Sequence, residues 1–322
     1  MPADPTGVTT EDVLLPTDDG EVHARWYRPA SPDGGLPTPT VVWLHGGGFL
    51  FGSIDMPESH LVAEGLAERG CRVLTVDYAL TPVPVIAARG RSGHPTPLRQ
   101  ASAVVQEARA ATTGRLTVGG ASAGACLAAA TVLDLHDAGA AAADAAVFVY
   151  GYFHRDVGPV PPEIQRRRRG HRRFTHDPRV LRVVNGLYAP VASGPRSRGP
   201  SGAGQDDLSG GAGVAVPGGV RVLGSTAGGA DAGNAGGSRR LAGRDAFPGG
   251  SDLTGFPPSL LVDADYDVFR ASSERFAAEL RTQDISVDQR MLPGSDHGFL
   301  NRPRSPWFAP TLDAIAATSH GR

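Results

Sequence analysis

The chain has no lysine, and all 31 of its basic residues are arginine. This absence excludes mechanisms that need a lysine amine as a Schiff-base former or as a general base. The 43 glycines and 27 prolines indicate a GC-rich coding sequence rather than a function. Because 33 acidic residues give a net charge of −2, no overall positive field attracts nucleic acid or an anionic membrane.

Cysteine is scarce as well, since only Cys71 and Cys126 are present. Two cysteines do not form a disulfide framework, and we expect both to be buried free thiols. Residues 1–10 lack the cationic start and apolar stretch of a secretion signal, and no run of about 18 apolar residues suggests a membrane span. These absences predict a cytoplasmic protein.

The sequence does contain apolar, β-branched runs that alternate with helix-forming stretches. Strands are predicted at residues 22–27, 40–44, 71–76, 116–120, 145–150, 259–262 and 285–292. Helices are predicted between Pro57 and Gly70 and at residues 97–112, 123–135, 268–283 and 305–317. This alternation predicts the α/β class, with a mostly parallel sheet that helices cover on both faces.

The regular pattern fails between residues 153 and 250. An arginine cluster occupies residues 165–173, residues 178–187 predict a short helix, and residues 193–250 are rich in Gly, Ser, Ala and Arg. Because such a composition buries too little apolar surface to offset chain entropy, we expect a mobile insertion within a single domain of residues 1–322. Alternatively, part of the segment is an out-of-frame translation, because GC-rich genes read in a wrong frame give Arg, Gly and Ala runs.

The pentapeptide Gly120-Ala121-Ser122-Ala123-Gly124 lies between a predicted strand and a predicted helix. Alone, it fits a glycine-rich turn with an incidental serine. A strand, a tight turn and a helix around G-x-S-x-G form a nucleophile elbow, whose small residues let a substrate carbonyl approach the hydroxyl. This context makes Ser122 the candidate nucleophile.

A serine hydroxyl needs a base within hydrogen-bond reach, and that base is usually histidine. His297 follows the last predicted strand, at the edge where an open α/β sheet binds its ligand. The other histidines fall on strand faces, at helix ends or in loops. A single histidine in a glycine loop is more often structural, but the position of His297 along the chain makes it the candidate base.

A carboxylate must orient this imidazole, and Asp263, Asp265 and Asp267 all follow the apolar run of residues 259–262. Asp267 is preferred because it lies in the loop before the next predicted helix. Asp265, and then Asp296, remain alternatives. The order serine, aspartate, histidine is that of the α/β hydrolases.

Backbone amides that could stabilise an oxyanion occur in His45-Gly46-Gly47-Gly48-Phe49, directly after a predicted strand. Three successive glycines also fit a simple loop. Combined with the candidate triad, they predict an oxyanion hole formed by Gly46, Gly47, Gly48 and Ala123.

Together these residues resemble the hormone-sensitive-lipase family of α/β hydrolases, the bacterial family IV esterases. The resemblance covers about residues 10–150 and 245–318, with motifs at residues 45–49, 77–82, 120–124, 265–270 and 297–299. It implies an α/β-hydrolase fold without metal or organic cofactor, and a cap built partly from residues 153–250. The implied site residues are Ser122 as nucleophile, Asp267 as acid, His297 as base, and Gly47, Gly48 and Ala123 as donors, with Gly46 close by.

The sequence departs from the family where members usually carry Asp-Tyr-Arg-Leu-Ala-Pro-Glu. Here Ala79, Thr81 and Val83 replace the arginine, the alanine and the glutamate. A second acidic residue that often follows the catalytic aspartate is replaced by Ala271. These losses weaken the support of the glycine loop and of the acid loop.

The expected function is that of a serine carboxylesterase or acetyl hydrolase acting on a small, short-acyl ester. A deacetylase of an N-acetylated metabolite would use the same residues. A non-catalytic ligand-binding protein of this fold is a third hypothesis, against which His297 argues, because receptor relatives lack that histidine. Arg166–Arg169 with Arg172 and Arg173 suggest a nucleic-acid patch only weakly, since the net charge is negative and Phe174 is the only nearby aromatic. We therefore expect neither nucleic acid nor a membrane as a partner.

Overall fold

A computed structural model describes residues 7–30, 37–82, 92–140, 143–167, 176–190 and 246–322. In these residues eight strands form one sheet in the order β1-β2-β4-β3-β5-β6-β7-β8. The strands are β1 (Thr9–Thr17), β2 (Gly20–Arg28), β3 (Thr40–Leu44), β4 (Arg72–Val76), β5 (Leu116–Ala121), β6 (Ala145–Val149), β7 (Ser259–Tyr266) and β8 (Val287–Asp296).

The sheet is parallel from β4 to β8, whereas β1 and β2 form an antiparallel hairpin and β2 runs antiparallel to β4. Every residue of β3, β5 and β6 is buried, which explains their continuous apolar or small-residue sequences. Strand β1 was not predicted, because an edge strand that is mostly exposed needs no apolar run.

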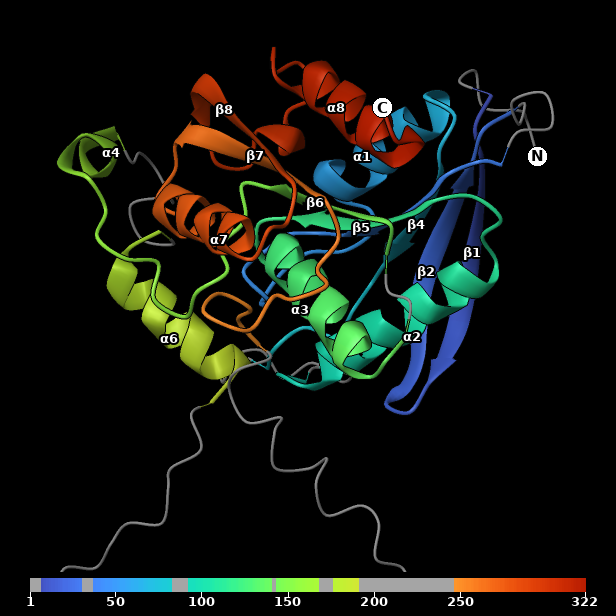
Figure 1. Cartoon of the computed structure of the whole chain (residues 1–322), viewed down its shortest axis with the longest axis horizontal. Coiled ribbons are helices and arrows are strands. Elements are labelled where there is room, and N and C mark those ends of the chain that lie inside the picture. Colours follow the sequence, from blue (N-terminus) through green and yellow to red (C-terminus); the bar gives the residue numbers. More distant parts are fainter. Residues whose placement is uncertain (1–6, 31–36, 83–91, 141–142, 168–175, 191–245) are drawn as a thin grey trace, which may run out of the picture. The chain divides into compact units, whose positions relative to one another are not determined.

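Helices cover both faces of the sheet, as predicted (Figure 1). Helices α1 (Pro57–Glu68) and α8 (Phe308–His320) pack on one face, where Trp43, Leu66 and Ile315 are buried together. Helices α2 (Thr96–Ala110), α3 (Ala123–Asp137) and α7 (Arg270–Thr282) pack on the other face, around Phe148 and Phe276. The predicted α/β class, with a mostly parallel sheet covered on both faces, is therefore confirmed.

The last two strands extend further than their apolar residues predict. Strand β7 continues to Tyr266 and β8 to Asp296, with an irregular register between Ala264 and Tyr266. The extension follows from backbone pairing, which polar residues can join as readily as apolar ones. It places Asp267 and His297 directly after neighbouring parallel strands, at the same edge of the sheet.

The segment from 153 to 250 contains two described helices, α4 (Pro162–Arg167) and α6 (Pro178–Tyr188). The predicted short helix at residues 178–187 is confirmed, and Asp177 caps it by accepting a hydrogen bond from the amide of Arg179 (2.9 Å). At its end, Tyr188 is buried and stacks on Phe49. Most of the predicted mobile insertion, residues 168–175 and 191–245, lies outside the described residues.

Chain contacts define one compact unit of Met1–Val191 with Gly243–Arg322 and a second of Ala192–Ala242. All elements described here belong to the first unit, and the single-domain organisation of residues 1–322 stays a prediction. Within the described residues both cysteines are free and buried, as expected. None of the helices in this part of the chain is long and apolar enough to span a bilayer.

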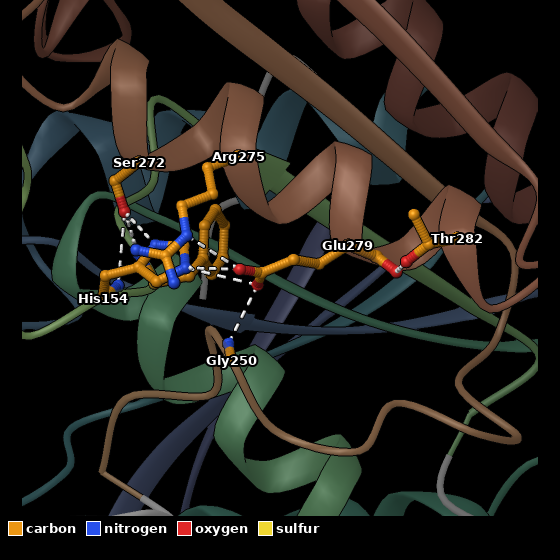
Figure 2. Close-up of polar contacts among 7 residues, drawn as sticks. His154, Gly250, Ser272, Arg275, Glu279 and Thr282 are labelled. Carbon is orange, nitrogen blue, oxygen red and sulfur yellow. Dashed lines mark hydrogen bonds and ion pairs between the residues drawn. The ribbon is translucent and has the colours of Figure 1, made fainter.

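The two ends of the 153–250 segment are joined at a stem, formed by Phe153, His154, Gly249 and Gly250. The amide of Gly249 donates to the carbonyl of Phe153 (2.7 Å). Figure 2 shows that Glu279 of α7 holds both ends, because it accepts from the Gly250 amide (2.9 Å) and lies 3.1 Å from Nε2 of His154. The stem thereby fixes both ends of the segment on α7.

Candidate active site

Ser122 lies at the sharp turn between β5 and α3. Its backbone has φ 55° and ψ −118°, a region that costs energy for any residue other than glycine. The turn also packs closely on the β3 end, since a Cβ at Gly120 would lie 2.5 Å from the Leu44 carbonyl oxygen and one at Gly124 would overlap that carbonyl. The glycines of the pentapeptide are therefore required by space, and the elbow predicted from them is present.

His297 follows β8 and points its ring at Ser122, with Nε2 lying 3.0 Å from Oγ. The rings of Tyr150 and Phe269 contact the imidazole edge-on, with centroids 4.9 and 5.0 Å away. Its side chain is only 12% exposed. Ring packing on two sides leaves the imidazole little freedom to turn away from the serine.

Oδ2 of Asp267 lies 2.6 Å from Nδ1 of His297. The other carboxylate oxygen of Asp267, Oδ1, accepts a hydrogen bond from the amide of Phe269 (3.0 Å). Asp267 is 2% exposed. A carboxylate at Nδ1 keeps the imidazole proton on that nitrogen, so the lone pair of Nε2 faces the serine.

The two alternative acids lie elsewhere. Asp265 pairs with Arg270 (3.3 Å) and accepts from the Gly294 amide (2.9 Å), while Asp296 lies 3.8 Å from Arg302. The structure thus brings Ser122, His297 and Asp267 into one hydrogen-bonded chain.

The oxyanion loop, defined here as residues 45–49, follows β3. Gly47 and Gly48 have φ values of 116° and 63°, and a Cβ at Gly47 would overlap the Phe51 carbonyl, so this loop needs its glycines. Among the described residues, no group accepts a hydrogen bond from the amides of Gly47, Gly48 or Ala123. These three amides are free to serve an incoming oxygen atom.

Gly46 differs from the prediction that it contributes to the oxyanion hole. Its amide donates to Oε1 of Glu58 (2.8 Å), so this donor is already used. The sequence could not reveal the conflict, because Glu58 lies twelve residues further along and reaches back from α1.

A pocket of about 650 Å³ contains Ser122, His297, Gly47 and Gly48 in its wall. Its volume suits a small organic molecule. The apolar part of the wall comes from Leu50, Phe51, Met56, Tyr152 and Phe269 and from Val180, Leu181 and Val184 of α6. The polar part comes from Glu58, His176, Asn301 and Arg302. Residues of the 153–250 segment therefore form one side of the pocket.

Sequence patterns missed several of these wall residues. Glu58 carried no signal, because an acid in the first turn of a helix is common. His176 was assigned to a loop, yet its ring lies edge-on to His297 with centroids 4.8 Å apart. The spacing of Val180, Leu181 and Val184 could have indicated an apolar helix face that packs on another part of the molecule.

A second chain of serine, histidine and carboxylate links Ser272, His154 and Glu279 at the stem (Figure 2). Here Oγ of Ser272 accepts hydrogen bonds from the amides of Phe153 (2.9 Å) and His154 (3.2 Å), and the serine is 2% exposed. Neither Ser272 nor His154 lines the Ser122 pocket. Burial lowers the pKa of His154. This second chain serves as a structural contact, because it joins the two ends of the 153–250 segment to α7.

Metal ligation finds no support in the described ranges, where no three His, Cys, Asp or Glu side chains gather. In the arginine cluster, Arg166 and Arg167 end α4, and Arg167 lies over the ring of Tyr266 (3.8 Å). The other arginines of the cluster, Arg168, Arg169, Arg172 and Arg173, lie outside the described residues.

Comparison with known proteins gives a consistent result. A family model described as the alpha/beta hydrolase fold matches residues 41–211 and 239–301. The chain is 33% identical over 138 residues to the carboxylic ester hydrolase LipN of Mycobacterium tuberculosis, covering 38% of this chain and 32% of LipN. It is 37% identical over 83 residues to the acetyl esterase of Salmonella paratyphi B, covering 25% of this chain and 23% of that protein. The chain thus matches about a third or less of the length of these relatives.

Solved structures share the fold over nearly the whole chain. A hyperthermophilic esterase from Pyrobaculum calidifontis superimposes with a TM-score of 0.69 and 24% identity, covering 97% of this chain and 85% of that chain. A bacterial heroin esterase gives a TM-score of 0.67 and 22% identity, covering 98% of this chain and 84% of that chain.

Proposed function

Because the chain belongs to the α/β-hydrolase family, in agreement with its resemblance to the family IV esterases, we propose that it is a serine carboxylesterase or acetyl hydrolase. Its substrates are small esters with short acyl groups. The observation that carries the proposal is the hydrogen-bonded chain from Asp267 through His297 to Ser122 in the wall of a 650 Å³ pocket.

In the first step, Oγ of Ser122 attacks the ester carbonyl carbon and Nε2 of His297 takes the serine proton. The 3.0 Å separation of these atoms is within the reach that general-base catalysis needs. Asp267 stabilises the imidazolium that results. When the tetrahedral intermediate collapses, the ester bond breaks and the imidazolium gives its proton to the departing alkoxide.

The negative charge on the carbonyl oxygen is stabilised by the amides of Gly47, Gly48 and Ala123. Removing one such donor typically lowers kcat about 10²- to 10³-fold. In the second half of the reaction, His297 takes a proton from water, the resulting hydroxide attacks the acyl-enzyme, and the acid leaves as Ser122 recovers its proton.

The preference for short acyl groups is an expectation from the sequence, and Val180, Leu181 and Val184 of α6 form the apolar wall that would face the acyl group. The name of one relative, an acetyl esterase, agrees with it.

The test is a series of p-nitrophenyl acetate, butyrate and octanoate with the wild type and Ser122→Ala, extended by p-nitroacetanilide as the amide. We expect turnover of the acetate and butyrate by the wild type only, with lower kcat/KM for the octanoate. Faster turnover of the anilide than of the acetate would instead support the deacetylase.

Labelling with a fluorophosphonate supplies an internal control, because the described residues include two serine–histidine–carboxylate sets. Peptide mapping should find the label on Ser122 and not on Ser272. Wild-type rates equal to those of Ser122→Ala on every ester, together with an unlabelled Ser122, would refute the proposal.

A further inference from the structure

We propose that Glu58 is a positioning residue that holds the oxyanion loop in place against the segment carrying His297. The inference rests on the proposed esterase function and deepens it, because Glu58 touches neither the nucleophile nor the base. It acts through Gly46 on one side and through Tyr150 and Asn301 on the other.

Glu58 lies in the first turn of α1, lines the pocket, and is only 2% exposed. Its Oε1 accepts from the Gly46 amide (2.8 Å), and its Oε2 accepts from the Tyr150 hydroxyl (2.8 Å) and from Nδ2 of Asn301 (2.8 Å). A buried carboxylate is costly unless its lone pairs are satisfied. Three donors from three separate segments satisfy this one.

No arginine or histidine forms an ion pair with Glu58 in the part of the chain that the structure describes. An uncompensated buried charge is destabilising, so the three hydrogen bonds are what offsets the burial of this carboxylate. Its carboxylate accepts only from neutral donors among the described residues. Two of these donors, Gly46 and Asn301, belong to the oxyanion loop and to the segment that follows His297.

The contact with Gly46 fixes the peptide that precedes the proposed donor Gly47. The fit is tight, because a Cβ at Gly46 would overlap Oε1 of Glu58. On the other side, the Tyr150 ring packs against His297 (4.9 Å), and Asn301 lies in the short helix η1 (Phe299–Asn301) that follows His297. Glu58 thus sets the oxyanion donors and the base at a fixed separation.

The hydroxyl of Tyr150 remains a donor at neutral pH. Burial, and then the neighbouring Glu58 carboxylate, hold the pKa of this phenol well above its usual value. The hydrogen-bond pattern therefore requires an acceptor at both oxygens of residue 58, a condition that an amide side chain does not meet.

This requirement can be tested by exchanging the acid and the amide between positions 58 and 301. In Glu58→Gln the amide NH₂ faces Nδ2 of Asn301, so two donors oppose each other. In Asn301→Asp two carboxylates oppose each other. The double variant Glu58→Gln with Asn301→Asp restores a donor and an acceptor across the same 2.8 Å contact. Glu68→Gln, an exposed position in the same helix, is the matched control.

With p-nitrophenyl acetate we expect Glu58→Gln to lower kcat about 10- to 100-fold, because displacement of catalytic groups by about 1 Å costs up to 10²-fold. KM should change less than about twofold, since an oxyanion donor acts on the transition state rather than on the bound ester. The double variant should recover most of kcat, and Glu68→Gln should match the wild type.

Thermal unfolding of each variant separates positioning from loss of the fold. Tyr150→Phe offers a milder change, which removes one donor to Glu58 and keeps the ring against His297, and it should lower kcat about three- to tenfold with little effect on KM. An active wild type with unchanged kcat in Glu58→Gln, or a double variant no better than its poorer parent, would overturn this proposal alone. A wild type inactive on every ester would overturn the proposed function and this inference with it.

Discussion

Replacing Asp267 by asparagine tests the assignment of the acid at constant shape. The new side chain can keep Oδ1 on the Phe269 amide, and its NH₂ then lies where Oδ2 now meets Nδ1 of His297 at 2.6 Å. Because an NH₂ group donates, Nδ1 must offer its lone pair, and the imidazole proton moves to Nε2. That proton then points at Oγ of Ser122, so the base cannot accept the serine proton.

The wrong tautomer should lower kcat about 10⁴-fold, equivalent to about 5.5 kcal/mol of activation free energy. The assay is hydrolysis of p-nitrophenyl acetate, with the thermal midpoint confirming that the fold is intact. Asp265→Asn and Asp296→Asn are matched controls, since Asp265 pairs with Arg270 and Asp296 with Arg302, and both should stay within about threefold of the wild type. A large loss in either control, with less than a tenfold loss in Asp267→Asn, would refute the reasoning.

Three further predictions address stability and pocket shape. Burial raises the pKa of Asp263 to about 6 from 3.8, so stability falls as pH rises from about 4 to 6, because the folded state keeps a proton that the unfolded chain has lost. Asp263→Asn should therefore stabilise the protein at pH 8 by up to about 3 kcal/mol and give no gain at pH 4, and equal urea midpoints at pH 8 would contradict this. Phe276→Ala removes a buried ring that stacks on Phe153 (4.2 Å) and should cost about 3–5 kcal/mol in urea unfolding, whereas a loss below about 1 kcal/mol would mean that the core collapses around it. Val184→Phe narrows the pocket on the α6 side and should lower kcat/KM for the butyrate ester more than for the acetate ester. An unchanged ratio of the two kcat/KM values would mean that the acyl group does not bind next to Val184.

The sequence predicted the features that depend on neighbouring residues. Ser122 could be located because the strand, the turn and the helix around it follow one another along the chain. His297 and Asp267 could be located because parallel strands bring their ends to one edge. The features that were missed depend on contacts between residues that are far apart in the sequence. One example is the hydrogen bond from the Gly46 amide to the side chain of Glu58, which lies in a different element.

Patterns of apolar residues also do not show which polar segments pair as strands at the edge of a sheet. Strand β1 carries exposed polar residues and still pairs with β2 along its length, because backbone groups make the ladder. Helix α6 was predicted from its residues, but its place in the pocket wall was not, since the pattern does not say which surface an apolar face covers.

The closed stem has a consequence for how such a gene can evolve. Because Gly249 bonds to Phe153 and Glu279 holds both ends, the chain leaves β6 and returns towards β7 at one fixed point on α7. Doubling the length of a flexible loop adds only about 0.6 kcal/mol of closure cost. A change of chain length between the two ends of the stem therefore need not disturb the register of β6 and β7. The pocket wall that α6 supplies can therefore change in one part of the gene while Ser122, Asp267 and His297, encoded on either side, keep their places.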